Sequence, residues 1–152
     1  QQWFHPFPYI IEFTCSPSVS SRVIKVDKNI LSAVSTEGTR GAASRFSHAL
    51  THHFRVLTIA IKDIVWEHPD FSGSLESVEI QLLRHLRNAS AHHNEFYWGA
   101  GRSRREPTPI EWRGKRVEPS LEGTKLYCDF LAPGDFFVLL DDISLLLKRK
   151  RT

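Results

Sequence analysis

The stretch LLRHLRNASAHHNEFYW, residues 82–98, combines the apolar spacing of a core helix with a high density of basic and titratable side chains. Leu82, Leu86 and Ala89 follow one another at steps of four and three residues, which predicts a helix with one apolar face. The same stretch contains five basic residues: Arg84, His85, Arg87, His92 and His93. We therefore expect a helix that packs against a core on one face and carries ionisable groups beside it.

The start of this helix is predicted from the residues that precede the stretch. Ser74 is a suitable N-cap, and Glu76 places a negative charge in the first turn. Leu75 and Val78 extend the apolar stripe toward the N-terminus. We expect the helix to begin directly after Ser74.

Two other helices are predicted from apolar periodicity. One lies within residues 38–68 and is ended by Pro69; its stripe is Phe46, Leu50, Phe54, Leu57, Ile61 and Ile64. The other begins near Pro133, which suits the first helical position, with Asp135 close to the positive end of the helix dipole. Its stripe is Phe136, Leu139, Ile143 and Leu146.

The remaining segments are less regular. Residues 99–132 contain Gly, Pro and Arg with short alternating pieces, IEWRGKRVEP and TKLYCDF, which predict a long loop holding a small hairpin. In residues 1–36, YIIEF is compatible with a short strand, and Val26, Ile30, Leu31 and Val34 with a short helix. The expected fold is all-α: a compact helical bundle over residues 37–152 with one long loop carrying a small β-hairpin, preceded by an N-terminal extension.

Composition agrees with a single globular domain. A chain of 152 residues can bury roughly two thirds of the surface exposed by its unfolded form. Hydrophobic residues make up 41% and charged residues 24%, and neither a membrane-spanning run nor a secretory signal is present, so we expect a cytoplasmic protein. Cys15 and Cys128 are widely separated and are expected to be isolated thiols.

Basic residues are unevenly distributed along the chain. The net charge is +3 and the isoelectric point is about 9.0. One cluster comprises Arg102, Arg104, Arg105, Arg113, Lys115 and Arg116, and the tail ends in Lys148, Arg149, Lys150 and Arg151. Such clusters favour a nucleic-acid partner, although basic residues at a helix end also complement the helix dipole.

The helical positions of Arg87 and His92 limit how these two residues can cooperate. At about 100° per residue, Arg87 lies about 140° from the core direction of Leu82 and His92 about 80° to the other side, so neither points straight into the core. On a helix unbroken through His92 the two side chains would diverge by roughly 140°. Either fraying of the helix after Ala89 or a second copy of the chain would bring such groups together. His93 falls near the core direction, and we expect it to be buried and hydrogen-bonded.

The segment LRHLRNASAH resembles the motif of HEPN domains, in which an arginine is followed by four to six residues and then a histidine. Asn88 matches the small polar residue that commonly follows the arginine in that family. The continuations HNEFYWG, RGK and LEGTKLYCDFLAPGDFFVLL are similar to plasmid- and defence-associated branches. The resemblance extends over about residues 42–147.

The resemblance implies a dimeric helical bundle that acts as a metal-independent endoribonuclease, without a cofactor, in a toxin or antiphage setting. It assigns catalysis to Arg87 and His92, with Asn88, His93 and Asn94 in support. Arg84 and the cluster in residues 102–116 are then candidates for RNA binding. An antitoxin or another defence-system protein is a possible partner. In the branch paired with nucleotidyltransferases a tyrosine occupies the position of Asn94, so control by nucleotide transfer is not expected here.

These residue types suit cleavage of RNA by its own 2′-hydroxyl. Histidine, with an ordinary pKa near ~6.5, can accept or donate a proton at neutral pH. Arginine offers a permanently charged fork that matches phosphate oxygens. Two copies across a twofold axis would place two histidines and two arginines around one phosphate. The alternative is a noncatalytic HEPN-like module that binds RNA or a protein.

Two weaker patterns complete the set of candidates. His48, His52 and His53 have a spacing compatible with a metal on one helical face, but no completing Cys, Asp or Glu is nearby, so solvent-facing or dimer-facing histidines are favoured. Residues 96–98, Phe-Tyr-Trp, either stack on bases or anchor the long loop on the bundle.

Overall fold

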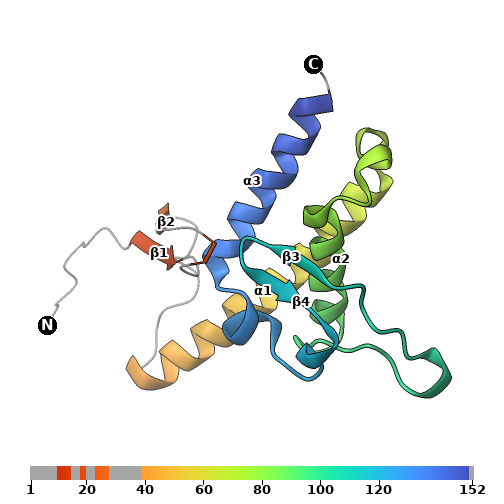
Figure 1. Cartoon of the computed structure of the whole chain (residues 1–152). Coiled ribbons are helices and arrows are strands. Elements are labelled where there is room, and N and C mark those ends of the chain that lie inside the picture. Colours follow the sequence, from red (N-terminus) through yellow and green to blue (C-terminus); the bar gives the residue numbers. More distant parts are fainter. Residues whose placement is uncertain (1–9, 15–17, 20–22, 28–38, 151–152) are drawn as a thin grey trace, which may run out of the picture.

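The computed structural model describes residues 10–14, 18–19, 23–27 and 39–150. Within them the chain is predominantly helical, with α1 at Thr39–Glu67, α2 at Val78–Ala91 and α3 at Pro133–Lys150. Figure 1 shows α1 and α2 packed beside each other, with the hairpin of β3 (Ile110–Trp112) and β4 (Lys115–Val117) next to α2. None of the described helices has the length and apolar character needed to span a bilayer.

The core lies where the three helices meet the segments that follow α2. It is formed by Phe54 and Val65 of α1, by the apolar face of α2, and by Phe136, Leu139 and Ile143 of α3. Leu82, Leu86 and Ala89 are buried as predicted, together with Ile80 and Leu83. The wider burial on α2 arises because other parts of the chain cover it as well as α1.

The bounds of α1 confirm the predicted helix, but its apolar stripe is partly wrong. Phe54 is buried, and Leu50 and Ile61 pack against the core. Leu57 is 41% exposed and Ile64 62% exposed. The helix instead presents Phe54, Thr58, Ile61 and Val65 to the core, because steps of four and three residues fit two adjoining faces equally well.

The predicted start of α2 is also wrong. Residues Pro69–Ser74 form a short 3₁₀ helix, and its own cap is the His68 ring, which accepts a hydrogen bond from the Asp70 N–H at 3.3 Å. Ser77 is the N-cap of α2, and Glu79 is the acidic residue of its first turn. Pro69 starts the extra helix because its fixed φ suits a first helical position, and burial of Phe71 holds that turn against the core.

The start of α3 and the loop hairpin are confirmed. Asp135 is buried, and its side chain accepts a hydrogen bond from the Ala132 N–H at 2.9 Å, directly before the helix. Strands β3 and β4 are antiparallel, and Arg113 and Gly114 turn between them with φ of 46° and 74°. The other alternating piece, TKLYCDF, is no strand; Leu126–Phe130 form a π-helical turn.

A second hairpin precedes the helices, so the fold is not purely α-helical. Strand β1 (Ile10–Thr14) pairs antiparallel with β2 (Val23–Asp27). The predicted strand in YIIEF is therefore confirmed, whereas Val26 lies in β2 and not in a helix. The other members of that expected helix, Ile30, Leu31 and Val34, lie outside the described residues.

Candidate functional site

The motif helix α2 ends within the Arg87–His92 motif. Its last helical residue is Ala91, and His92 is the C-cap, whose N–H donates to the carbonyls of Asn88 at 3.0 Å and Ala89 at 3.1 Å. His93 and Asn94 follow with φ of 57° and 69°, in the left-handed region. Two successive left-handed residues reverse the chain, so the segment after the helix returns along the bundle.

The expectation that His93 is buried is wrong. His93 is exposed, because α2 ends two residues earlier and its helical direction no longer applies. His92 is exposed as well, and its ring lies 4.8 Å from the ring of Tyr97, measured between centroids. The histidine of the motif therefore stands at the surface on the end of a helix.

Asn94 is the buried polar residue of this turn. Its side-chain Nδ2 donates to the Tyr127 carbonyl at 3.2 Å, and its Oδ1 accepts from the Tyr127 N–H at 3.1 Å. Its own carbonyl accepts from the Leu126 N–H at 2.7 Å. The Tyr127 hydroxyl is in turn hydrogen-bonded to Thr58 at 2.6 Å, and burial raises the pKa of Tyr127. Asn94 thus joins the end of α2 to a π-helical turn and, through it, to α1.

The aromatic residues after the motif differ in burial. Phe96 and Trp98 are buried, and the Trp98 indole N–H donates to the Pro119 carbonyl at 3.0 Å. Phe96 exchanges backbone hydrogen bonds with Gly123 and Thr124. These two residues anchor the loop, whereas Tyr97 between them is 43% exposed and faces His92.

A cleft of about 730 Å³ opens beside the end of α2. On the helix side its lining includes Arg84, His85, Asn88 and His92; Asn88 is three residues after His85 and four after Arg84, and His92 follows four residues later, so these residues share one face. Tyr97 and Arg105 contribute from the following loop. Titratable, cationic and aromatic side chains thus converge in one space.

His85 lies in this cleft and was not assigned a role from the sequence. Burial, together with the neighbouring Arg84 charge, lowers the pKa of His85 to about 4. Its ring lies 5.9 Å from the Trp98 ring in an edge-on arrangement. Burial therefore favours the neutral imidazole of His85, whose unprotonated ring nitrogen can accept a hydrogen bond in the cleft.

Arg87 does not share the cleft with His92. It lines a second hollow, of about 450 Å³, together with Lys62 and Trp66 of α1. Arg84 and Asn88 line both spaces and lie between them. Because Arg87 and His92 line different spaces, one protomer does not bring them onto a common atom.

Arg55 of α1 supports this region in a way that the sequence did not indicate. Its Nε donates at 2.8 Å to the Ser90 carbonyl, which is in the last turn of α2. The last carbonyls of a helix lack partners within the helix, so this hydrogen bond fixes the end of α2 against α1. No sequence signal connects two residues 35 positions apart.

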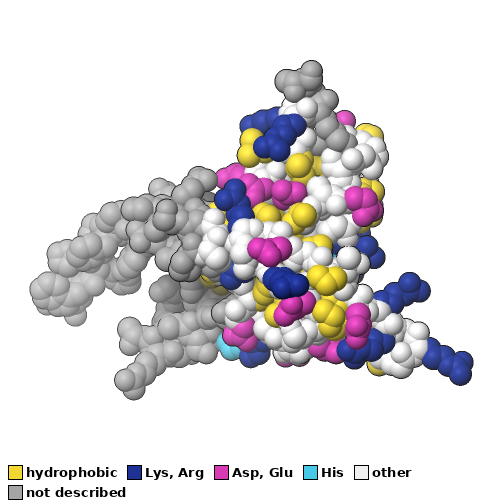
Figure 2. All heavy atoms as spheres, in the orientation of Figure 1, with side chains coloured by type: hydrophobic (Ala, Val, Ile, Leu, Met, Phe, Trp, Pro, Cys, Tyr) yellow, Lys and Arg dark blue, Asp and Glu magenta, His cyan; other side chains and the backbone are white. Residues whose placement is uncertain are grey.

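Most of the basic cluster in residues 102–116 is already paired within the chain. Arg104 contacts Glu122 at 2.8 Å and Arg116 contacts Glu118 at 3.4 Å. Figure 2 shows basic side chains at the end of the projecting loop, with acidic side chains close to them. Among the candidates in this cluster, Arg102 and Arg105 form no ion pair with the described part of the chain.

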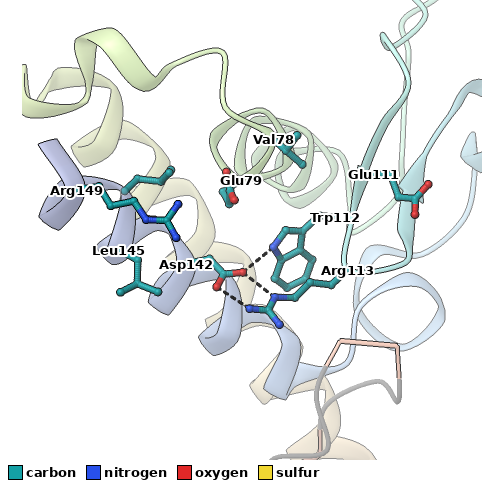
Figure 3. A pocket seen from close by; sticks show the side chains of 9 residues that line it. Val78, Glu79, Glu111, Trp112, Arg113, Asp142, Leu145 and Arg149 are labelled. Atoms are coloured by element: carbon teal, nitrogen blue, oxygen red, sulfur yellow. Dashed lines mark hydrogen bonds and ion pairs between the residues drawn. The ribbon is translucent and has the colours of Figure 1, made fainter.

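Arg113 and Lys115 hold the hairpin in place. Both ends of the Arg113 fork contact Asp142 of α3 at 2.8 and 2.9 Å, and the Trp112 indole donates to the same carboxylate at 2.9 Å (Figure 3). These hydrogen bonds lower the pKa of Asp142. Lys115 donates to the Phe130 carbonyl at 2.6 Å. The hollow of about 460 Å³ beside Asp142 is therefore bordered by an ion pair that attaches the hairpin to α3.

The remaining candidates lie apart from the cleft. His48, His52 and His53 are exposed on α1, and no three His, Cys, Asp or Glu side chains among the described residues are grouped as metal ligands would be. Lys148, Arg149 and Lys150 belong to the last turn of α3, where cations complement the dipole, and Arg151 lies outside the described residues.

Comparison of the chain with protein-family models, with curated proteins and with solved structures finds no match.

Proposed function

We propose that the protein is a metal-independent endoribonuclease of the HEPN type that acts as a homodimer in a toxin or antiphage setting. The observation that carries the proposal is the cleft at the end of α2, in which His92 and His85 lie with Tyr97, Asn88, Arg84 and Arg105. A phosphodiester in this cleft would meet the His92 imidazole for proton transfer and an aromatic ring beside a base. Arg84 and Arg105 would face its charge, although Glu76 and Glu106 also line the cleft.

The proposed reaction needs only proton transfer and charge stabilisation. A base removes the proton of the 2′-hydroxyl, whose oxygen attacks phosphorus, and the bond from phosphorus to the 5′-oxygen breaks. An acid gives a proton to the departing 5′-oxygen. The products are a 2′,3′-cyclic phosphate and a free 5′-hydroxyl. His92, exposed in the cleft, is the proposed proton-transfer residue, and Asn88 supports the bound phosphate.

Because Arg87 and His92 are separated in one protomer, catalysis by both residues requires a composite site. In one protomer the two side chains line different spaces. A second protomer related by a twofold axis could place its Arg87 beside the first protomer's His92, since such an interface brings the same surface of both copies together. The dimer would then stabilise the developing charge with a guanidinium that a single chain does not direct there.

The first expected result is cleavage of RNA in excess chelator. The purified protein should leave a 2′,3′-cyclic phosphate, or its hydrolysis product, on one fragment and a 5′-hydroxyl on the other; end-labelling and mass spectrometry would identify both. A mixture of His92→Ala and Arg87→Ala protomers should regain part of the lost activity, because a mixed dimer keeps one intact pair. Activity that requires Mg²⁺, or full activity of a monomer at high dilution, would contradict the proposal.

The second expected result separates one loop arginine from another. Arg105 lines the cleft and has no ion pair with the described residues, whereas Arg116 lies outside it and contacts Glu118. Arg105→Gln should weaken RNA binding several-fold and lower the slope of log affinity against log salt by about 1, as expected for one lost phosphate contact. Arg116→Gln removes the same charge and should change the slope much less. Salt titrations followed by fluorescence anisotropy would measure these slopes. If both variants show the slope of the wild type, the loop does not belong to the RNA interface.

A noncatalytic RNA-binding or protein-interaction module is the second candidate. It is favoured by the same separation of Arg87 and His92, because a binding surface does not require the two residues to meet. Expression discriminates between the two functions: a nuclease should be toxic to cells and lose its toxicity with His92→Ala, whereas a binding module should not.

A further inference from the structure

The hollow on the Arg87 side of α2 has a composition of its own. Lys62 and Trp66 are one turn apart on α1 and face Arg84, Arg87 and Asn88 on α2. The space measures about 450 Å³. It is formed where the two helices pack together, so both walls consist of regular backbone whose positions are fixed by the core.

The charges in this hollow are unbalanced. Three of its five lining residues are cationic, and no carboxylate is among them. Arg84 and Arg87 form no ion pair with any described residue, and Lys62 has one contact with Asp63, at 3.3 Å, on the helix surface. An anion in the hollow would therefore meet three positive groups, of which only Lys62 has a neighbouring carboxylate, that of Asp63.

Arg87 carries a buried donor that lacks an acceptor. Its Nε is shielded from solvent and has no hydrogen-bond partner in the described part of the chain. Leaving such a donor unpaired costs about 1–3 kcal/mol, and more for a charged group. A phosphate oxygen in the hollow would be a suitable acceptor once the Arg87 side chain turns its Nε toward it, because guanidinium donors match phosphate geometry.

Lys62 is held in place for the same task. Its ammonium lies 4.8 Å from the centroid of the Trp66 ring, a cation–π contact that restricts a flexible side chain. Its side chain is 21% exposed, so the charge remains accessible from the hollow. A cation fixed in this way loses less side-chain entropy when it binds an anion.

We propose that Lys62 and Arg84 form a phosphate-binding subsite in this hollow, which holds an RNA phosphate next to the scissile phosphate that Arg87 contacts. The identity of the polymer rests on the proposed function, whereas the preference for a phosphate does not. Arg84 and Asn88 line both this hollow and the His92 cleft, so a strand held in one passes directly to the other. Lys62, outside the Arg87–His92 motif, becomes a residue that positions the substrate.

The test uses two probes that the protein cannot cleave: inorganic phosphate, followed by ³¹P NMR line broadening, and a short single-stranded DNA, followed by fluorescence anisotropy. Lys62→Gln should reduce phosphate broadening, weaken DNA binding about 5- to 10-fold at low salt, and lower the salt slope by about 1. Lys125→Gln, which removes an exposed cation elsewhere, should leave all three unchanged. Arg84→Gln, at an exposed position, provides a second variant if Lys62→Gln folds poorly.

Equal DNA affinity in Lys62→Gln, Arg84→Gln and Lys125→Gln would overturn the subsite. Phosphate broadening that depends on Lys62 while DNA affinity does not would identify a site for small anions and would overturn its assignment to RNA. Neither probe is a substrate, because inorganic phosphate has no ester bond and DNA lacks the 2′-hydroxyl. Lys62-dependent binding in a protein that never cleaves RNA would therefore refute the proposed nuclease and leave the subsite standing.

Discussion

Replacing His92 by alanine should lower the rate of RNA cleavage by about 10²–10⁴-fold, the range that general acid–base groups contribute. The free energy of unfolding should change by less than about 0.5 kcal/mol, because His92 is exposed at the C-cap and contacts only the Tyr97 ring among described aromatic groups. Its backbone φ of −99° accepts alanine without strain. Single-turnover cleavage and urea denaturation would measure the two quantities.

The neighbouring histidine supplies the matched control. His93 is exposed, differs from His92 by one position and does not line the cleft. His93→Asn keeps a residue that tolerates the left-handed φ of 57° and should retain cleavage close to the wild-type rate. If both variants cleave equally well, His92 has no catalytic role; if both lose activity, the turn as a whole is required and the effect is not specific to one imidazole.

Replacing Asn94 by alanine should destabilise the protein by about 2–4 kcal/mol. The change leaves the buried N–H and carbonyl of Tyr127 without their partners, and each unpaired group costs about 1–3 kcal/mol. Alanine must also adopt a φ of 69°, which it disfavours. Loss of this junction should loosen the contact of the π-helical turn with α1. Equilibrium urea denaturation gives the change in the free energy of unfolding.

Asn94→Gly separates the two causes. Glycine adopts the left-handed conformation freely but also lacks the amide, so it should be about 1 kcal/mol more stable than the alanine variant and still less stable than the wild type. Asn94 was expected from the family resemblance to support the site, and the structure places its side chain on Tyr127. An Asn94→Ala protein of normal stability that no longer cleaves RNA would assign Asn94 a direct functional role.

The helices were predictable because their signals are local. The apolar stripe of α3 and the end of α1 before Pro69 each depend only on residues close together in the sequence, and both predictions agree with the structure. The β3–β4 hairpin was predictable for the same reason, since Gly114 lies between two short alternating segments. The helical step of about 100° per residue predicted that Arg87 and His92 would not grip one atom within a single chain. In the structure the two residues line different spaces.

The predictions were wrong where the local sequence is compatible with two alternatives. Ser74 and Ser77 both qualify as N-caps, and the 3₁₀ helix that begins at Pro69 decided in favour of Ser77. Leu57 and Ile64 fit an apolar stripe on α1 as well as Val65 does. The other elements pack against the face that contains Val65, so Leu57 and Ile64 remain exposed. His93 was assigned to the core by continuing a helix that in fact ends at Ala91.

By itself, the sequence determined the helices and the direction in which each motif residue leaves α2, because helical geometry relates residues a few positions apart. Only the tertiary structure decided what those residues face. The Asn94–Tyr127 and Arg55–Ser90 hydrogen bonds join positions 33 and 35 residues apart, and Lys62 reaches the Arg87 hollow from another helix. Contacts between residues so far apart in the sequence depend on how the whole core packs, and they cannot be predicted from the spacing of residues within one segment.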